Sequence, residues 1–319
     1  MSRLNSNSRA QAGFTLAELL VVLAILAILT TVASQSLTPL ASQARYEATQ
    51  RTLTNLSSAI VSSNQSGGAT VITGFVADMG RLPDITSEAA LWNDLVLGVG
   101  LSPYTPYAIN LGPTSNPTTV ALSYGWRGPY INLAPGTTTI TDGWKQSLSY
   151  ALATDGSLAI ASPGNPTGET GTLQTLLPIS KMCASQITVR LYGLDSNNQH
   201  IPLTGTATVE MAVPATTATP EGKITAIAVT PTSSGSTVTD LVFQFNPNTQ
   251  GAGLWAGPRI LTATYSQASD DSTSGNTTTT NTYTPYNQVV YLNVLPGASH
   301  DLELLVARKV TTTMQNPDP

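Results

Sequence analysis

The sequence predicts a mixed α+β fold in which a long N-terminal helix packs on a small antiparallel sheet and an all-β sandwich follows. Apolar residues recur at helical spacing through residues 14–66, which favours one continuous helix. From residue 187 onward, short alternating stretches are bounded by turn residues, which is typical of strands. The chain has 319 residues, enough for two domains behind the N-terminal segment.

The helix starts with an apolar run, residues 14–33, that contains a single charge, Glu18. Twenty residues of helix extend about 30 Å, which matches a bilayer core. Before the run lies a short leader with Arg3, Arg9 and no acid, and positive flanks stay in the cytoplasm. A buried carboxylate is costly in a membrane helix, so Glu18 is expected to have a role. The alternative is a plain single-pass anchor.

The helical pattern continues beyond the apolar run. Gly67 and Gly68 are expected to end the helix, and Pro39 is expected to kink it because proline lacks a backbone donor. The apolar positions that define the second half are Leu37, Leu40, Ala44, Ala48, Leu56 and Ile60.

Turn and cap signals punctuate the next region. Ser87 and Glu88 open a short helix that Gly98 closes, and the Thr154–Ser157 stretch is a hairpin signal. The aromatic residues of this region are expected to pack in a core, with a sugar-stacking platform as the alternative. They are Trp126, Tyr130, Trp144 and Tyr150.

Seven predicted strands make up the C-terminal region, and their number favours an antiparallel sandwich of immunoglobulin or transthyretin type. Ser266–Thr284 is expected to be a polar solvated loop, and residues 311–319 a tail. The predicted strands are Ile187–Leu194, Ala207–Val213, Ile224–Pro231, Asp240–Asn246, Arg259–Ser266, Val289–Leu295 and Asp301–Val306.

Composition argues against several classes of function. The formal charge is −5, and removal of the leader with Arg3 and Arg9 leaves 11 basic against 18 acidic residues, or −7, so no nucleic-acid partner is predicted. Cys183 is the only cysteine and is expected to be a small buried hydrophobe. His200 and His300 lack metal-ligand spacing, and no catalytic constellation is evident. We therefore predict no enzyme, no cofactor and no metal.

The stretch Gly13-Phe14-Thr15-Leu16-Ala17-Glu18 resembles the processing site of type IV pilins and pseudopilins. The resemblance implies that a prepilin peptidase cuts between Gly13 and Phe14 and methylates the new amine of Phe14. It also implies that Glu18 acts in filament assembly, where it pairs with the amine of a neighbouring subunit.

Three further stretches, Phe75–Pro83, Gly125–Ile131 and Asp142–Ala151, are similar to the globular domain of the type II secretion major pseudopilin. This similarity is partial, because that family commonly has Asp-Pro-Trp-Gly where this chain has Asp142-Gly143-Trp144-Lys145. The stretch that corresponds to the family's calcium loop, Ser162–Gly171, offers only Glu169 as a carboxylate, so no calcium site is expected there.

These observations predict a structural subunit that is assembled into a type II secretion pseudopilus or a type IV pilus-like filament. The expected partners are prepilin peptidase, other pilin or pseudopilin subunits and the inner-membrane assembly platform. The alternative is a minor pilin or anchored display module whose sandwich binds a surface, a glycan or a secreted substrate. A membrane-anchored enzyme is the third possibility.

The expected location is the bacterial inner membrane, with a single span, a cytoplasmic N-terminus and periplasmic C-terminal domains, and then the filament. The expected divisions of the chain are a leader (1–13), a transmembrane and stem helix (14–66), a pseudopilin-like α+β domain (67–178), a β-sandwich domain (179–310) and a tail (311–319).

Overall fold

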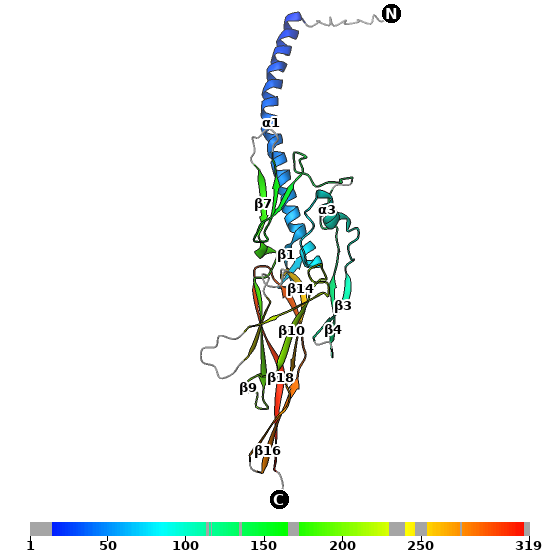
Figure 1. The fold of residues 1–319 in the computed structure, drawn as a ribbon. Coiled ribbons are helices and arrows are strands. Elements are labelled where there is room, and N and C mark those ends of the chain that lie inside the picture. The colour runs from blue at the N-terminus through cyan, green and yellow to red at the C-terminus, as the bar shows by residue number, and fades with distance from the viewer. Residues whose placement is uncertain are drawn as a thin grey trace, which may run out of the picture.

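The computed structural model describes residues 15–112, 115, 117–133, 136–164, 172–229, 240–245, 254–274 and 276–315, except for the side chains of 32–39 and 69. Figure 1 shows an elongated molecule in which the start of the first helix and the end of the last strand lie at opposite ends. The fold is mixed α+β as predicted, with helices first and mostly β-sheets after them.

Helix α1 (Leu16–Ile60) is 45 residues long. Its second half buries one face against the body of the protein, and the buried positions follow the spacing of helical turns. Those positions are Thr49, Leu53, Leu56, Ala59 and Ile60. Of the positions predicted for this face, Leu56 and Ile60 are buried, but Leu40, Ala44 and Ala48 are exposed, and the side chain of Leu37 lies outside the described part. The helix ends at Ile60 because Val61 adopts an extended backbone conformation.

The predicted helix end at residue 66 is therefore wrong. Residues 62–66 form strand β1 (Ser62–Ser66), which pairs with β2 (Ala69–Thr73) in an antiparallel hairpin. Gly67 and Gly68 form its two-residue loop with φ values of 60° and 83°. Two consecutive positive φ angles are what a tight hairpin turn needs, so the glycines close a hairpin and do not cap a helix.

The body region, defined here as residues 62–182, packs around the second half of α1. Its buried core includes Phe75, Leu91, Leu95, Leu158 and Ile160, all at 0% exposure. After β2 its elements are α2 (Phe75–Met79), α3 (Glu88–Trp92), the π-helical turn η1 (Asn93–Leu97), β3 (Thr105–Leu111), β4 (Thr118–Tyr124), β5 (Ser149–Leu152), β6 (Leu158–Ser162), β7 (Leu173–Leu177) and the 3₁₀ turn η2 (Ile179–Lys181).

In the C-terminal region, residues 183–315, the residues that the structure describes form two sheets that share one apolar core. One sheet has the order β11-β10-β14-β17, and the other runs β12-β13-β8-β18-β16-β15, with β9 paired to β8. The strands are β8 (Gln186–Leu194), β9 (His200–Ile201), β10 (Thr206–Ala212), β11 (Lys223–Thr225), β12 (Ile227–Val229), β13 (Leu241–Phe245), β14 (Gly257–Ser266), β15 (Asp270–Ser274), β16 (Thr277–Pro285), β17 (Gln288–Val294) and β18 (Ser299–Gln315).

Each of the seven predicted strands has a counterpart here, but the pairing of β18 departs from the expected antiparallel pattern. Strand β18 lies parallel to β8, with Ser299 opposite Gln186 and Arg308 opposite Leu194. It also continues to Gln315, so residues 311–315 are strand and not the predicted tail.

The predicted loop Ser266–Thr284 is also wrong in most of its length. Strands β15 and β16 pair as a hairpin, and β16 pairs in turn with β18 from Thr277↔Gln315 to Pro285↔Ala307. Threonine is β-branched and suits a pleated surface, so a polar threonine run can form a strand when a neighbouring strand supplies its hydrogen bonds.

The body and C-terminal regions meet over a broad junction. Backbone hydrogen bonds join Met182 and Ala184 to the segment that leads into β14, through Ala256 N–H to Met182 O and Ala184 N–H to Leu254 O. The β3–β4 hairpin lies against the sheet of β10 and β14, and its Ile109 and Leu122 share a buried cluster with Ile260. The two regions are therefore connected by packing as well as by the chain.

Candidate processing and assembly site

Helix α1 begins with a capping box built by Thr15 and Glu18. The Thr15 hydroxyl accepts a hydrogen bond from the Glu18 backbone N–H at 3.3 Å. In return, Glu18 Oε2 accepts hydrogen bonds from the backbone N–H and the hydroxyl of Thr15, both at 2.9 Å. These bonds satisfy backbone donors that a helix start leaves unpaired, and they hold the carboxylate at the positive end of the helix dipole.

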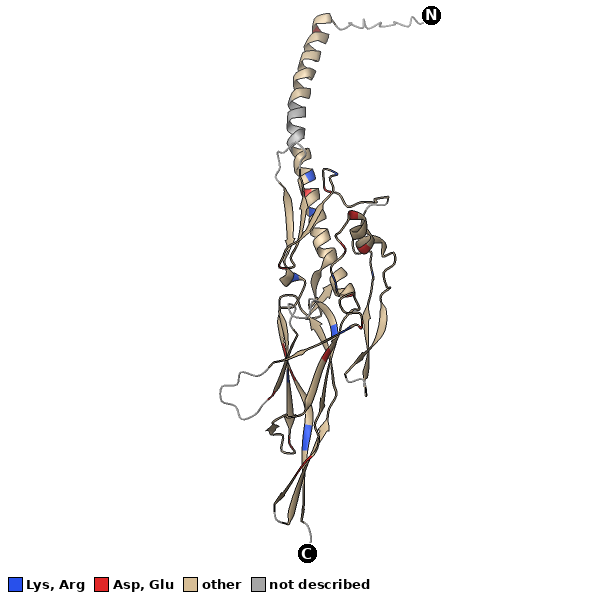
Figure 2. Ribbon diagram, in the orientation of Figure 1, with Lys and Arg blue, Asp and Glu red and all other residues tan. Residues whose placement is uncertain are grey.

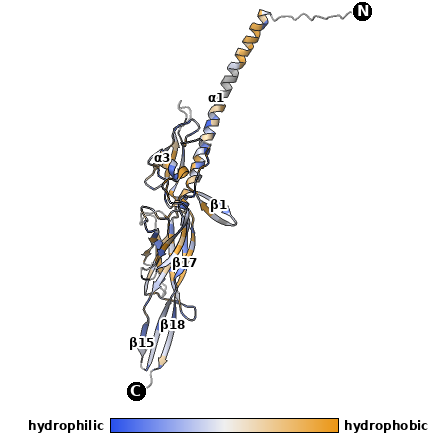
Figure 3. Cartoon of the chain, turned by 90° about the vertical axis from the view of Figure 1, so that its right-hand side faces the viewer, coloured by the Kyte–Doolittle hydropathy of each residue, from blue (hydrophilic) through white to orange (hydrophobic). Residues whose placement is uncertain are grey.

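The first half of α1 is predominantly hydrophobic, as Figure 3 shows. Its large apolar side chains that the structure describes are exposed. Leu16 is 82% exposed, and the charged residues of α1 other than Glu18 lie in the half nearer the body (Figure 2). A contiguous exposed apolar surface of this kind marks contact with a membrane or with other proteins. The other exposed members are Leu19, Leu20, Val21, Val22, Leu23, Ile25, Leu26, Ile28 and Leu29.

The structure describes only some of the residues predicted for this site. Glu18 lies in the first turn of α1, whereas Gly13 and Phe14 lie outside the described residues. Helix α1 continues through position 39. The side chain of Pro39 lies outside the described part, so the kink expected there stays a prediction. In the part of the chain that the structure describes, no helix combines the length and the hydropathy that a membrane crossing needs.

Thr15 is the residue of this site that sequence reasoning missed. Its signal was readable, because threonine followed three residues later by glutamate, just before an apolar run, is the sequence pattern of a capping box. The pattern adds a local structural role to Glu18 that is independent of any partner.

Acidic residues inside the body region are partnered within the fold. Asp78, in α2, accepts hydrogen bonds from Arg127 Nε at 3.2 Å and from the Tyr130 hydroxyl at 3.1 Å, and its Oδ1 lies 3.1 Å from Arg127 Nη2. Burial raises the pKa of Asp78 above its ordinary value, an effect that Arg127 and Tyr130 oppose. Asp94 pairs in the same way with Arg81, at 2.7 Å. These pairs tie the turn after α2 and the segment after β4 to the rest of the body.

The aromatic residues of the body region pack in its core, as the sequence predicted. Trp144 is buried, and Trp126, Tyr130 and Tyr150 pack against the same cluster. Trp126 also donates its indole N–H to the Asp94 carbonyl at 2.8 Å. Cys183 is buried as well, and burial raises the pKa of its thiol to about 12, so the thiol stays protonated and unreactive at neutral pH.

Comparison with known proteins bears on the N-terminus. The family model described as the prokaryotic N-terminal methylation motif matches residues 8–34, a range that contains Gly13, Phe14 and Glu18. No curated protein sequence matches the chain.

Among solved structures, the chain is similar to the crystal structure of GBS52, the minor pilin in the gram-positive pathogen Streptococcus agalactiae. The sequences are 13% identical, and the match covers 52% of this chain and 65% of that one, somewhat under two thirds of its length. The TM-score is 0.22, which is too low to support an inference about this chain from that structure.

The matched motif covers residues 8–34, so it characterises the N-terminus. That N-terminus is like the one of type IV pilins and pseudopilins and carries their cleavage and methylation motif. Such a motif implies processing by prepilin peptidase and assembly with other pilins.

Proposed function

We propose that this protein is a structural subunit of a type II secretion pseudopilus or a type IV pilus-like filament, assembled through its N-terminal helix. One observation carries the proposal: a carboxylate stands in the first turn of a long helix whose first half is apolar and exposed, within the methylation motif. We further propose that the mature protein is anchored by this helix in the inner membrane before an assembly platform there extracts it.

The chemistry of assembly follows from the helix start. A cut between Gly13 and Phe14 leaves an amine with an ordinary pKa of about 7.7–8.0, one residue before Thr15. Among the described residues, the hydrogen bonds of Glu18 use Oε2 and leave Oε1 for a further donor. The amine of a neighbouring subunit is a suitable donor, because the pair would neutralise two charges inside an apolar bundle of helices. Loss of one partner of a buried pair costs about 3–5 kcal/mol, so the pair would fix the axial offset between subunits.

A second candidate is a minor subunit that displays the C-terminal region. The observation that favours it is the elongated shape, in which the β15–β16 hairpin lies at the opposite end from the start of α1 (Figure 1). A helix held in a filament would point that end outward. Copy number separates the two candidates, because a filament body needs an abundant subunit and a display role needs few copies. For both candidates we propose a non-enzymatic function.

The proposal is tested by N-terminal sequencing and intact mass measurement of the protein purified from its native membrane or filament fraction. We expect a chain that starts at Phe14 and carries one additional methyl group. A Gly13→Asp variant serves as the matched control and should keep its leader. A native product that begins at Met1, or that is clipped after the apolar run, would contradict the proposal.

A further inference from the structure

Arg259, in strand β14, is a buried cation at the junction of the body and C-terminal regions. Its exposed fraction is 3%. Nη1 donates to the carbonyl of Pro258 at 2.7 Å and Nη2 donates to the carbonyl of Trp255 at 2.8 Å. These bonds use two of the five guanidinium N–H groups. Among the residues that the structure describes, no carboxylate lies within ion-pairing distance of this guanidinium.

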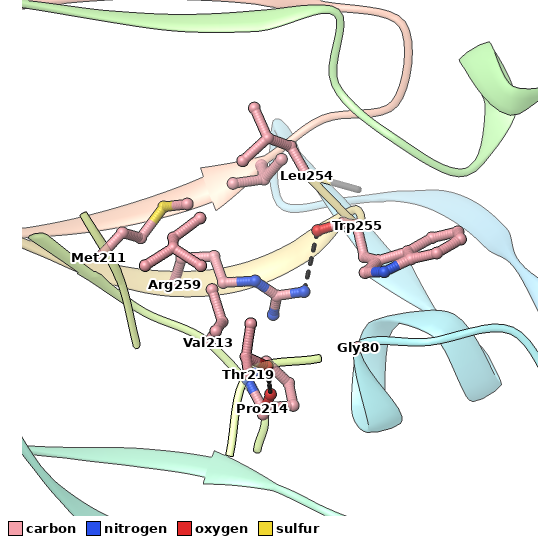
Figure 4. Close-up of a pocket in the computed structure, with 10 residues that line it drawn as sticks. Gly80, Met211, Val213, Pro214, Thr219, Leu254, Trp255 and Arg259 are labelled. Carbon is pink, nitrogen blue, oxygen red and sulfur yellow. Dashed lines mark hydrogen bonds between the residues drawn. The ribbon is translucent and has the colours of Figure 1, made fainter. Parts of the chain in front are cut away.

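The guanidinium points into a small cavity, as Figure 4 shows. Gly80, at the end of α2, lines the cavity from the body region, and Pro214, Thr219 and Trp255 line it from the C-terminal region. The cavity has a volume of about 10 Å³, which is room for one water molecule or one monatomic ion.

The charge of Arg259 decides between these two occupants. Burial lowers the pKa of the guanidinium to about 10, so it remains charged at neutral pH. The ionisable neighbour that acts on it is the Cys183 thiol, which is protonated and neutral under the same conditions. A water molecule supplies a hydrogen-bond acceptor but no charge, whereas an anion supplies both. Because a buried charge is costly unless it is paired, the anion is the better match.

We propose that this cavity binds one monovalent anion of about the size of chloride, held by the free N–H groups of Arg259. The bound anion neutralises Arg259 and stabilises the contact between the turn after α2 and the Pro214–Thr219 turn. A cavity of this size favours a monatomic anion over phosphate or a carboxylate.

The proposal is tested with the full chain in detergent, by following the unfolding temperature while sodium chloride replaces sodium gluconate at constant ionic strength. Because an anion that binds only the folded state stabilises it by mass action, we expect a saturable rise of about 2–4 °C. Crystals grown with bromide should show anomalous density beside Arg259. An unfolding temperature that ignores the halide, or bromide crystals without density there, would overturn the proposal.

Three variants make the test specific. Arg259→Met removes the charge and leaves an unbranched apolar side chain, and it should abolish the halide dependence. Arg259→Lys keeps the charge and should retain a weaker dependence. Arg190→Met removes an exposed arginine from strand β8 and should behave like the wild type. A halide dependence that survives in Arg259→Met refutes the site even if that variant is less stable overall.

Discussion

Glu18 is the residue on which the proposed assembly depends, and local hydrogen bonds fix its position. Two substitutions separate its two roles. Glu18→Gln keeps an oxygen that can accept from Thr15 but removes the charge, whereas Glu18→Ala removes both. Because the pair with a neighbouring amine needs the charge, we expect both variants to be cleaved normally and to enter filaments poorly. The loss corresponds to about 3–5 kcal/mol per subunit contact.

The measurement is the ratio of filament protein to membrane protein on immunoblots, together with the N-terminal sequence of each variant. If Glu18→Gln assembles like the wild type while Glu18→Ala does not, helix capping and not charge pairing explains the requirement, and the proposed amine contact is wrong.

Asp78 predicts a pH dependence of stability. Burial raises its pKa in the folded state above the ordinary value of 3.8, so the folded protein holds this proton more tightly than the unfolded chain does. Its contribution to the free energy of unfolding is therefore fully present below pH 3.8 and is lost as pH rises through the folded pKa.

We expect Asp78→Asn, which stays neutral, to lack this component. Urea unfolding of both proteins between pH 3 and pH 7 measures this component as the difference between the free energies of unfolding of the wild type and the variant. That difference should fall as pH rises. A difference that grows with pH would mean that Arg127 and Tyr130 outweigh burial and lower the pKa of Asp78.

At the scale of elements, the β15–β16 hairpin is the clearest case in which composition misled. The threonine run of β16 lacks the apolar alternation that marks a half-buried strand, and its side chains are mostly part-exposed. Its stability comes from β15 on one side and β18 on the other, and the sequence pattern does not show this pairing.

Hydrogen exchange tests this hairpin. Because β16 lies between two strands, its amides should be protected from exchange and not behave as those of a solvated loop. Thr280→Pro should remove that protection in β16 and in the paired part of β18, since proline cannot donate a ladder bond to either neighbour. A Thr280→Val control should keep it. Exchange in the wild type at the rates of an unstructured peptide would contradict the pairing.

Helix α1, unlike the β15–β16 hairpin, was predicted from the sequence over most of its length. The buried face of its second half was predicted only in part, because Leu40, Ala44 and Ala48 are exposed while Leu56 and Ile60 are buried. Its start and its apolar half were readable from spacing and from the residues at the cap. Its end was not, because two glycines are equally suited to stop a helix and to turn a hairpin. In the folded chain Ile72 of β2 is buried in one cluster with Ala77 and Ala256, so the hairpin also makes contacts that its own sequence does not show.

At the scale of the whole molecule, close backbone packing joins the body region to the C-terminal region. Gly80 has φ +63°, and a Cβ added there would meet the Pro214 ring at 2.8 Å. Gly100 has φ +78° with nothing within 4 Å, so it provides a matched control. We expect Gly100→Ala to cost about 1–2 kcal/mol from backbone strain alone.

Gly80→Ala should lose that amount and a further 1–3 kcal/mol, roughly, from overpacking at the junction. Urea unfolding curves of the two variants measure the difference. Equal losses in both would show that the contact between Gly80 and Pro214 does not contribute to stability.

The sequence by itself determined the features that depend on local pattern: the capped apolar helix with one acid in its first turn, the methylation motif and the places of the seven predicted strands among those of the C-terminal region. Cap geometry and side-chain periodicity are properties of neighbouring residues, so they can be read from order alone. Only the tertiary structure decided the parallel pairing of β18 with β8, the strand identity of the threonine run and the burial of Arg259 between two regions. Each of these depends on a partner far away in the chain, and the free energy of such contacts leaves no periodic trace in the sequence.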